Sequence, residues 1–244
     1  MRRSSVTSPP PRSIVSGWKK PRHDHVHLTG TAGAGGQIRG PRHVYPGPVA
    51  EADIAVVDGL RITGLAKTAA DIARASTFAQ ALTVFDSALR RGAAKKEIAE
   101  HLKGRRPGGP AARAALRFAD KDSESVGESW SRAQMIAALL PGARLQREYR
   151  VSGKTYRVDF DWAGRLIGEC DGMVKYDELL RPGESAETTM AAEKRRELAL
   201  RRLGLAVVRW NWGMLERGEV VPLLIGWLDA LGLRGASPLP VAAG

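Results

Sequence analysis

The sequence predicts an α+β fold, and three observations in its second half support this prediction. Two stretches with alternating apolar and polar side chains flank Ser152-Gly153, a dipeptide that favours a tight turn. A third apolar stretch, RLIGEC, follows within a few residues. Apolar residues three or four positions apart indicate helices before and after these strands. The predicted order is helix, three-stranded meander, helix, strand and helix, as in an α+β domain.

The first 43 residues are predicted to form a flexible basic arm. Residues 1–22 are rich in Ser, Pro and Arg, and VHL at 26–28 is a candidate short strand. GTAGAGGQIRG, at 30–40, is predicted to be a flexible loop. Its glycines do not fit a GxGxxG turn followed by a helix, which excludes a dinucleotide-binding site of that kind.

Residues 44–118 are predicted to be mainly helical. In STFAQALTVFDSALRRG, apolar residues at helical spacing indicate a helix that Ser76 or Thr77 caps and Gly92 ends. Asp86 lies on this helix and is expected to be a surface acid. KKEIAEHLKG and ARAALRFAD indicate two further helices, and the GRRPGGP between them is a candidate linker.

Residues 119–234 are predicted to form the α+β domain, and residues 235–244 a tail. SESVGESWSRAQMIAALLPG indicates a helix that Ser123 caps and that carries Glu128. One strand of the meander is expected to have an apolar face formed by Tyr156, Val158, Phe160 and Trp162. SAETTMAAEKRRELALRRLG indicates the next helix and LAVVRWN the last strand.

The positive charge of the chain is concentrated in its first half. Residues 1–118 contain 20 Lys/Arg and 8 Asp/Glu, a net charge of +12, whereas residues 119–244 contain 18 of each and are neutral. Such a basic field attracts polyanions, of which nucleic acid is the commonest. The alternative is a generally basic protein, rich in Arg, that has no polyanionic partner.

The single cysteine, Cys170, excludes an intramolecular disulfide framework and a cysteine zinc cluster, and it fits a reducing compartment. No apolar run follows Arg2 and Arg3, so we expect no signal peptide. The most apolar stretch, VVPLLIGWLDALGL, is too short to span a membrane and contains Asp229, which favours a core helix. These features predict a cytoplasmic protein that does not associate with membranes.

The stretch VDFDWAGRLIGECDGMVKY contains four acids and a lysine, namely Asp159, Asp161, Glu169, Asp171 and Lys175. A two-residue turn would place Asp159 and Glu169 on opposite faces of the sheet, whereas a three-residue turn over residues 163–165 pairs them directly. A bulge at Gly168 would give the same alignment. With either geometry their Cβ atoms lie roughly 5 Å apart, and Asp171 shares their face.

The predicted pair of Asp159 and Glu169 needs a compensating charge, because two carboxylates this close repel each other. Their oxygen atoms suit Mg²⁺ or Mn²⁺, which can activate water and neutralise charge on a phosphodiester. Lys175 and Arg157 are candidate cations for the phosphate or the attacking water. An exposed strand pair, whose acids neutralise Arg157 and Arg165, fits the spacing equally well.

The helix sequence EKRRELALRRLG places Arg196 on the side of its leucines. An arginine beneath an apolar face usually reaches a carboxylate or a phosphate. Extension of the side chain to solvent fits the pattern equally well. Arg195, Arg201 and Arg202 are expected on a solvent-exposed face that suits nucleic acid.

Five motifs in order carry a resemblance to a known family. SESVGESWSR, YRVDFDW, LIGECDGMVKY, EKRRELALRRLG and LAVVRWNW resemble the very-short-patch-repair-type (Vsr-like) endonuclease-like domains of the PD-(D/E)XK nuclease superfamily, over residues 119–232. VDGLRITGLAKTAADIA and ALTVFDSALRRG resemble a helical segment of AbiEi-type antitoxin proteins, and the combination resembles an actinobacterial variant. The resemblance implies a restriction-endonuclease-like C-terminal domain and a Mg²⁺- or Mn²⁺-dependent DNA endonuclease in genome defence or repair.

The resemblance also assigns the residues of a catalytic site. Asp159 and Glu169 match the two acids of the nuclease motif and Glu128 matches the glutamate of the first helix, which makes these three the implied metal ligands. Asp171 stands where the superfamily normally has lysine. Lys175 stands where related domains often have histidine, so it is the candidate replacement cation, with Asp171 assisting.

Arginines complete the implied site. Arg196 matches the arginine of the family's helix, and Arg196, Arg157 and Arg195 are the expected contacts to DNA phosphate. The alternative function is a non-catalytic, antitoxin-like DNA-binding transcriptional regulator that uses the same fold, with a cognate toxin or another protein as a further partner. No complete winged helix fits upstream of residue 44. Convergence of Asp159, Glu169 and Lys175 in one concave site would favour the enzyme.

Overall fold

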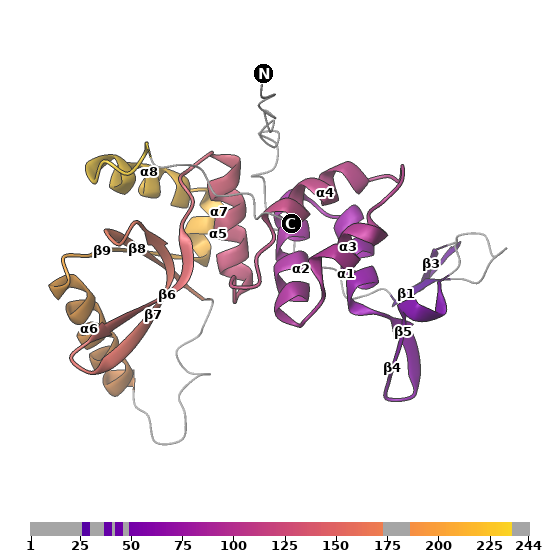
Figure 1. Cartoon of the computed structure of the whole chain (residues 1–244), viewed down its shortest axis with the longest axis horizontal. Helices are drawn as coiled ribbons and strands as arrows, with labels where there is room; N and C mark the ends of the chain where they lie inside the picture. Colours follow the sequence, from indigo (N-terminus) through magenta and orange to yellow (C-terminus); the bar gives the residue numbers. More distant parts are fainter. Residues whose placement is uncertain (1–25, 30–36, 41, 46–48, 173–185, 236–244) are drawn as a thin grey trace.

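The computed structural model describes residues 26–29, 37–40, 42–45, 49–172 and 186–235. These residues form three sheets and eight α-helices (Figure 1), which confirms the predicted α+β class. A mainly helical segment precedes a four-stranded sheet covered by helices. Within this part of the chain, no helix is long and apolar enough to cross a membrane.

A small sheet in the order β1-β3-β2 opens the structure; its strands are β1 (Val26–Thr29), β2 (Gln37–Arg39) and β3 (Arg42–Tyr45). Strand β1 confirms the strand expected at 26–28. The loop expected at 30–40 is wrong at its C-terminal end, because Gln37–Arg39 pairs antiparallel with β3. The glycine-rich composition predicted a loop there, but the backbone of these residues hydrogen-bonds to a neighbouring strand. The segment boundary expected after residue 43 falls inside β3.

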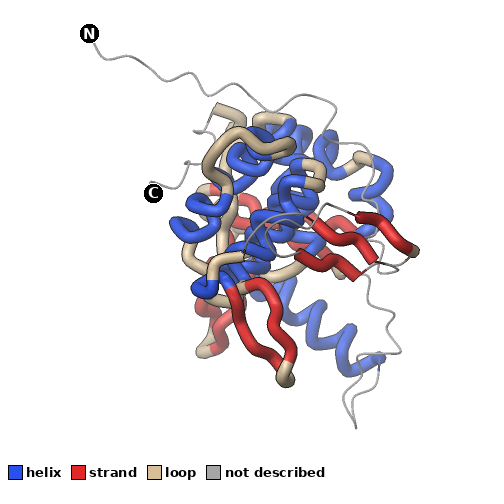
Figure 2. The backbone as a smooth tube through the Cα atoms, turned by 90° about the vertical axis from the view of Figure 1, so that its right-hand side faces the viewer, coloured by secondary structure: helices blue, strands red, loops and turns tan. Residues whose placement is uncertain are grey.

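A β-hairpin then replaces the start of the expected helical segment. A short 3₁₀ turn leads into β4 (Ile54–Val57), which pairs antiparallel with β5 (Leu60–Thr63). The turn residues Asp58 and Gly59 have positive φ angles of 49° and 77°. Two-residue hairpin turns require this geometry, and Asp-Gly favours it. Figures 1 and 2 both show this hairpin projecting beyond the helices.

Four helices follow the hairpin: α1 (Leu65–Arg74), α2 (Phe78–Arg90), α3 (Lys95–His101) and α4 (Gly109–Phe118). Thr77 caps α2, since its side chain accepts a hydrogen bond from Gln80 N and the Gln80 side chain accepts one from Thr77 N. Gly92 follows the last turn with a φ of 97°. The cap and the end predicted for this helix are therefore confirmed.

The C-terminal part has the predicted order with one extra short helix. It comprises α5 (Val126–Ala137), β6 (Arg144–Val151), β7 (Lys154–Trp162), β8 (Leu166–Asp171), α6 (Ala186–Arg202), β9 (Ala206–Asn211), α7 (Trp212–Arg217) and α8 (Val220–Ala230). The sheet order is β6-β7-β8-β9, with β9 parallel to β8. Helices α5 and α6 lie on opposite sides of this sheet (Figure 1). Helix α5 begins slightly later than predicted, because Ser125 and not Ser123 caps it.

The turn between β7 and β8 has the length that the acidic pair requires. Trp162 pairs with Leu166 and Phe160 with Gly168, so residues 163–165 form a three-residue turn. One further step in this register places Asp159 opposite Glu169. Of the two geometries predicted for this hairpin, the three-residue turn is confirmed.

The sheet is irregular where Asp159 lies. Strands β6 and β7 pair on either side of Gln146 and Asp159 but not at these two positions, and Gln146 has a φ of 51°. Val158 packs with Leu200 of α6, whereas Phe160 packs in the larger core next to α5. The prediction that β7 has a single apolar face is therefore wrong. The irregularity interrupts the alternation of side chains, so apolar residues of β7 pack on both faces of the sheet.

Gly168 of β8 lies beneath two tryptophan rings. A Cβ atom at this position would lie 2.6 Å from Cη2 of Trp210 and 2.9 Å from Cζ3 of Trp162. We expect Gly168→Ala to lower the free energy of unfolding by about 1–3 kcal/mol, because overpacking forces the rings to move. Urea-induced unfolding measures this.

The matched control is Gly226→Ala in helix α8, where nothing lies within 4 Å of an added Cβ atom. This substitution is expected to leave stability unchanged or raise it by about 0.5–1 kcal/mol, because alanine favours a helix interior more than glycine does. Equal losses for the two variants would contradict the packing described for Gly168.

Asp86 of α2 joins the helical segment to the C-terminal part. Its carboxylate is fully buried, and it accepts hydrogen bonds from Asp120 N at 2.8 Å, Ser129 Oγ at 2.8 Å and Arg132 Nη1 at 2.6 Å. Arg132 is buried as well, and its Nη2 donates to Phe118 O at 2.5 Å. The prediction that Asp86 is a surface acid is wrong, because α5 covers this face of α2 and buries the side chain.

Candidate active site

Three carboxylates from three elements form an acidic cluster next to the irregular part of the sheet. They belong to Glu128 of α5, Asp159 of β7 and Glu169 of β8, and all three are at least largely buried. Burial raises the pKa of each above its ordinary value, because it disfavours the charged form. The Asp159 charge adds to the pKa increase of both glutamates, so it lies within electrostatic reach of each.

Asp159 fills the gap where β7 and β8 separate. Its Oδ2 accepts a hydrogen bond from Cys170 N at 2.9 Å, in place of a strand-to-strand bond. This contact and the attraction of Arg196 lower its pKa but do not offset the effect of burial. The bond from Cys170 N therefore fixes one oxygen of the carboxylate at the end of the paired part of the strands.

Gln146 of β6 connects the carboxylates of Glu128 and Asp159. Gln146 is not among the site residues predicted from the sequence. Its Nε2 donates to Glu128 Oε2 at 3.0 Å, and its side chain is also hydrogen-bonded to Asp159. Glu128 Oε2 accepts a second bond, from Glu124 N at 2.8 Å. A lone glutamine in a strand has no distinctive spacing, and its positive φ is a property of the fold.

Arg196 of α6 lies against Glu169. Its Nη2 is 2.7 Å from Glu169 Oε1 and 2.6 Å from the carbonyl oxygen of Arg157. The interpretation that Arg196 reaches a carboxylate beneath the helix is confirmed. Cys170 points to the other face of the sheet, toward Ser131 of α5, as expected for a packing residue; burial raises its pKa to about 12, so the thiol stays protonated.

Other residues predicted for the site lie at the edge of this cluster or away from it, and the charge of Asp171 still adds to the pKa increase of Asp159. Asp171 is exposed at the end of β8, with an Arg209 nitrogen 3.3 Å away. The Arg157 side chain pairs with Glu124 at 2.6 Å, and Arg195 is exposed on α6. Lys175 lies outside the described residues, so its convergence with the two acids stays a prediction.

Asp161, the fourth acid of the hairpin, has a structural role. Its buried carboxylate accepts hydrogen bonds from Arg147 Nη1 and Tyr149 Oη, both at 2.7 Å, and from Gly164 N at 3.1 Å. The last of these holds the three-residue turn. Asp161 therefore supports the register that aligns the acidic pair.

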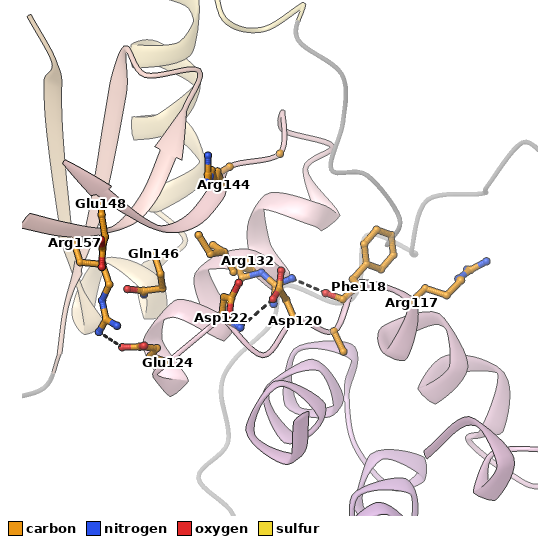
Figure 3. Close-up of a pocket in the computed structure, with 14 residues that line it drawn as sticks. Arg117, Phe118, Asp120, Asp122, Glu124, Arg132, Arg144, Gln146, Glu148 and Arg157 are labelled. Atoms are coloured by element: carbon orange, nitrogen blue, oxygen red, sulfur yellow. Dashed lines mark hydrogen bonds and ion pairs between the residues drawn. The ribbon is translucent and has the colours of Figure 1, made fainter. Parts of the chain in front are cut away.

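A groove of about 690 Å³ lies beside the acidic cluster, between residues 117–122 and strand β6. Figure 3 shows Gln146 at one side of it, near the ion pair of Arg157 and Glu124. Arg144 and Glu148 of β6 also line the groove. Both acidic and basic side chains line its walls, so it lacks the uniformly positive lining that suits a phosphate backbone.

The described residues contain no group of three or more His, Cys, Asp and Glu side chains arranged to hold a metal ion. A two-carboxylate centre remains, formed by Asp159 and Glu169 on paired strands. Mg²⁺ is usually held by one or two carboxylates together with substrate phosphates and waters. The donor set therefore fits a Mg²⁺ site that the substrate completes, and it does not form an all-protein cage.

Glu128 offers a test of the electrostatics. Because its folded-state pKa is raised, the stability that protonation of Glu128 adds is present at low pH and is lost as the pH rises through that pKa. We expect the stability of Glu128→Gln relative to the wild type to increase from pH 4 to pH 7, because glutamine stays neutral and can still accept the bond from Glu124 N. Urea unfolding at several pH values measures this, and a pH-independent difference would contradict it.

Comparison with known proteins finds two mycobacterial relatives. Uncharacterized protein MT2308 of Mycobacterium tuberculosis strain CDC 1551 / Oshkosh and Uncharacterized protein Rv2248 of strain ATCC 25618 / H37Rv are each 36% identical to the chain over 159 residues. The match covers 62% of this chain and 55% of each relative, so the chain spans about half the length of the curated relatives it matches. No family model matches the sequence, and no solved structure gives a significant match.

Proposed function

We propose that the chain is a Mg²⁺-dependent DNA endonuclease that hydrolyses phosphodiester bonds. The observation that carries the proposal is the register of β7 and β8, whose last pair, Phe160 with Gly168, brings the half-buried Asp159 next to the buried Glu169. Buried like charges are costly unless a cation compensates them, and such arrangements are concentrated at functional sites. The resemblance of five ordered motifs to Vsr-like nuclease domains agrees with this use of the pair.

Each residue of the centre has a proposed role in hydrolysis. Asp159 and Glu169 would hold Mg²⁺, which when bound polarises the phosphate and lowers the pKa of a bound water. Glu128, linked to Asp159 through Gln146, would set the position of that carboxylate or accept a proton from the water. Lys175 would steady the scissile phosphate. Exposed arginines such as Arg195 would bind the DNA backbone without sequence preference.

A specific contact favours the second candidate, a non-catalytic DNA-binding regulator. The guanidinium of Arg196 already compensates Glu169 at 2.7 Å, so this carboxylate is satisfied without a metal. Asp171, where a lysine would be expected, is paired with Arg209. A nuclease fold whose acids are neutralised in this way could retain DNA affinity and lose hydrolysis.

Incubation of the purified chain with supercoiled plasmid separates these functions. The enzyme is expected to convert the plasmid to nicked or linear DNA in Mg²⁺ or Mn²⁺ and to stop when EDTA is added. Binding of labelled duplex DNA, measured in EDTA by gel shift, should weaken steeply with salt for either function. Binding without cleavage under all metal conditions would favour the regulator, and the absence of both would contradict the two proposals together.

A further inference from the structure

We infer that Arg196 competes with the divalent cation for Glu169, so that the guanidinium keeps the centre closed to metal until it is displaced. This inference rests on the proposed function, because it concerns the same two-carboxylate centre. It identifies a residue of the chain itself that compensates the negative charge of two neighbouring carboxylates.

The contacts of Arg196 place a positive charge beside both carboxylates of the centre. Its Nη2 donates to Glu169 Oε1 at 2.7 Å, and the side chain is 24% exposed, whereas that of Glu169 is 8% exposed. Arg196 also attracts Asp159 electrostatically. The guanidinium therefore stands on the solvent side of Glu169 and acts on both carboxylates of the pair.

Competition follows from the geometry of the carboxylate. Glu169 is nearly buried, and Oε1 already accepts a short, charge-assisted hydrogen bond. A cation that binds this oxygen must remove the guanidinium and also overcome its repulsion. The second contact of Nη2, to the carbonyl oxygen of Arg157 at 2.6 Å, holds the guanidinium in this position.

A phosphate is the ligand that would displace Arg196. Arginine forms strong paired hydrogen bonds with phosphate oxygens, and the partly exposed Arg196 is next in sequence to the exposed Arg195. A DNA phosphate that draws Arg196 away from Glu169 frees a metal ligand and supplies another one itself. Because the coupling between two binding sites is reciprocal, bound DNA then raises the affinity for the metal, and bound metal raises the affinity for DNA to the same extent.

Titration of the full chain with Mn²⁺ in the absence of DNA, followed by isothermal calorimetry, tests the competition. Arg196→Gln is expected to bind Mn²⁺ about tenfold more tightly than the wild type, because only in the wild type must the metal break a hydrogen bond between charged groups. The matched control is Arg195→Gln, which makes the same change in net charge at an exposed neighbouring position and should stay within about twofold of the wild type. Arg196→Lys, which retains the charge, is expected to lie between the two.

The outcomes separate this inference from the function on which it rests. If Asp159→Ala binds Mn²⁺ as tightly as the wild type, the proposed metal centre is wrong. If Asp159→Ala loses binding but Arg196→Gln binds no more tightly than Arg195→Gln, the centre stands and the competition is refuted. Circular dichroism establishes that each variant is folded, and the Arg196→Lys titration still decides the question if Arg196→Gln unfolds.

Discussion

Replacement of Asp86 by alanine is expected to lower the free energy of unfolding by about 3–5 kcal/mol, because it leaves the buried charge of Arg132 without its partner. The Asp86 carboxylate is 2.6 Å from Arg132 Nη1 and also accepts bonds from Asp120 N and Ser129 Oγ. Burial outweighs the attraction of Arg132 and raises the pKa of Asp86, so the ion pair is retained at a cost in desolvation. Urea-induced unfolding followed by circular dichroism measures the loss.

Two further variants serve as a control and as a conservative substitution for Asp86→Ala. Asp122→Ala removes an exposed acid from the segment that joins α4 to α5, and it should change stability by less than about 0.5 kcal/mol. Asp86→Asn keeps an acceptor for Asp120 N but loses the charge, so an intermediate loss is expected. A loss below about 1 kcal/mol for Asp86→Ala would show that the pair does not join the two parts of the chain as described.

Asp159→Ala is expected to slow DNA cleavage by a factor of about 1,000 or more, which corresponds to about 4 kcal/mol of transition-state stabilisation. The variant loses one of the two carboxylates that would hold the cation. The fold should persist, because Asp159 lies at an irregular position where the strand pairing is already interrupted. The initial rate of plasmid nicking in Mg²⁺ measures the effect.

Glu148→Ala is the matched control for this substitution. Glu148 is an exposed acid on the adjacent strand that pairs in register with Arg157 and lies two positions along β6 from Gln146. Its loss should leave the nicking rate within about threefold of the wild type, since single exposed charges contribute little. Equal rates for Asp159→Ala and Glu148→Ala would remove Asp159 from the mechanism.

Local patterns predicted much of the fold and the alignment of the acidic pair. The alternation on either side of Ser152-Gly153 located β6 and β7, and the parity of side chains required either a three-residue turn or a bulge, of which the structure has the turn. Helical spacing placed Arg196 on the side of its leucines and left contact with a carboxylate or phosphate and extension to solvent both open; the structure shows the carboxylate. These features depend on short-range geometry, which a single sequence contains.

The remaining features depend on contacts between distant parts of the chain. Asp86 has the spacing of an ordinary helix residue, and only the packing of α5 against α2 buries it. Gln146 contacts Glu128 because β6 departs from regular geometry at that residue. The hairpin β4–β5 is a different case, since the Asp58-Gly59 turn was present in the sequence and was outweighed by the helical pattern after it.

The most direct test of the central claim is the rate at which supercoiled plasmid is nicked in Mg²⁺ by the wild type and by Glu169→Gln, with protein in excess over DNA. Glutamine has nearly the shape of glutamate but lacks the charge that would hold a cation. We expect a Mg²⁺-dependent rate for the wild type and a rate about 1,000-fold lower or undetectable for Glu169→Gln. Equal rates for the two proteins, or no nicking by the folded wild type in either Mg²⁺ or Mn²⁺, would contradict the account.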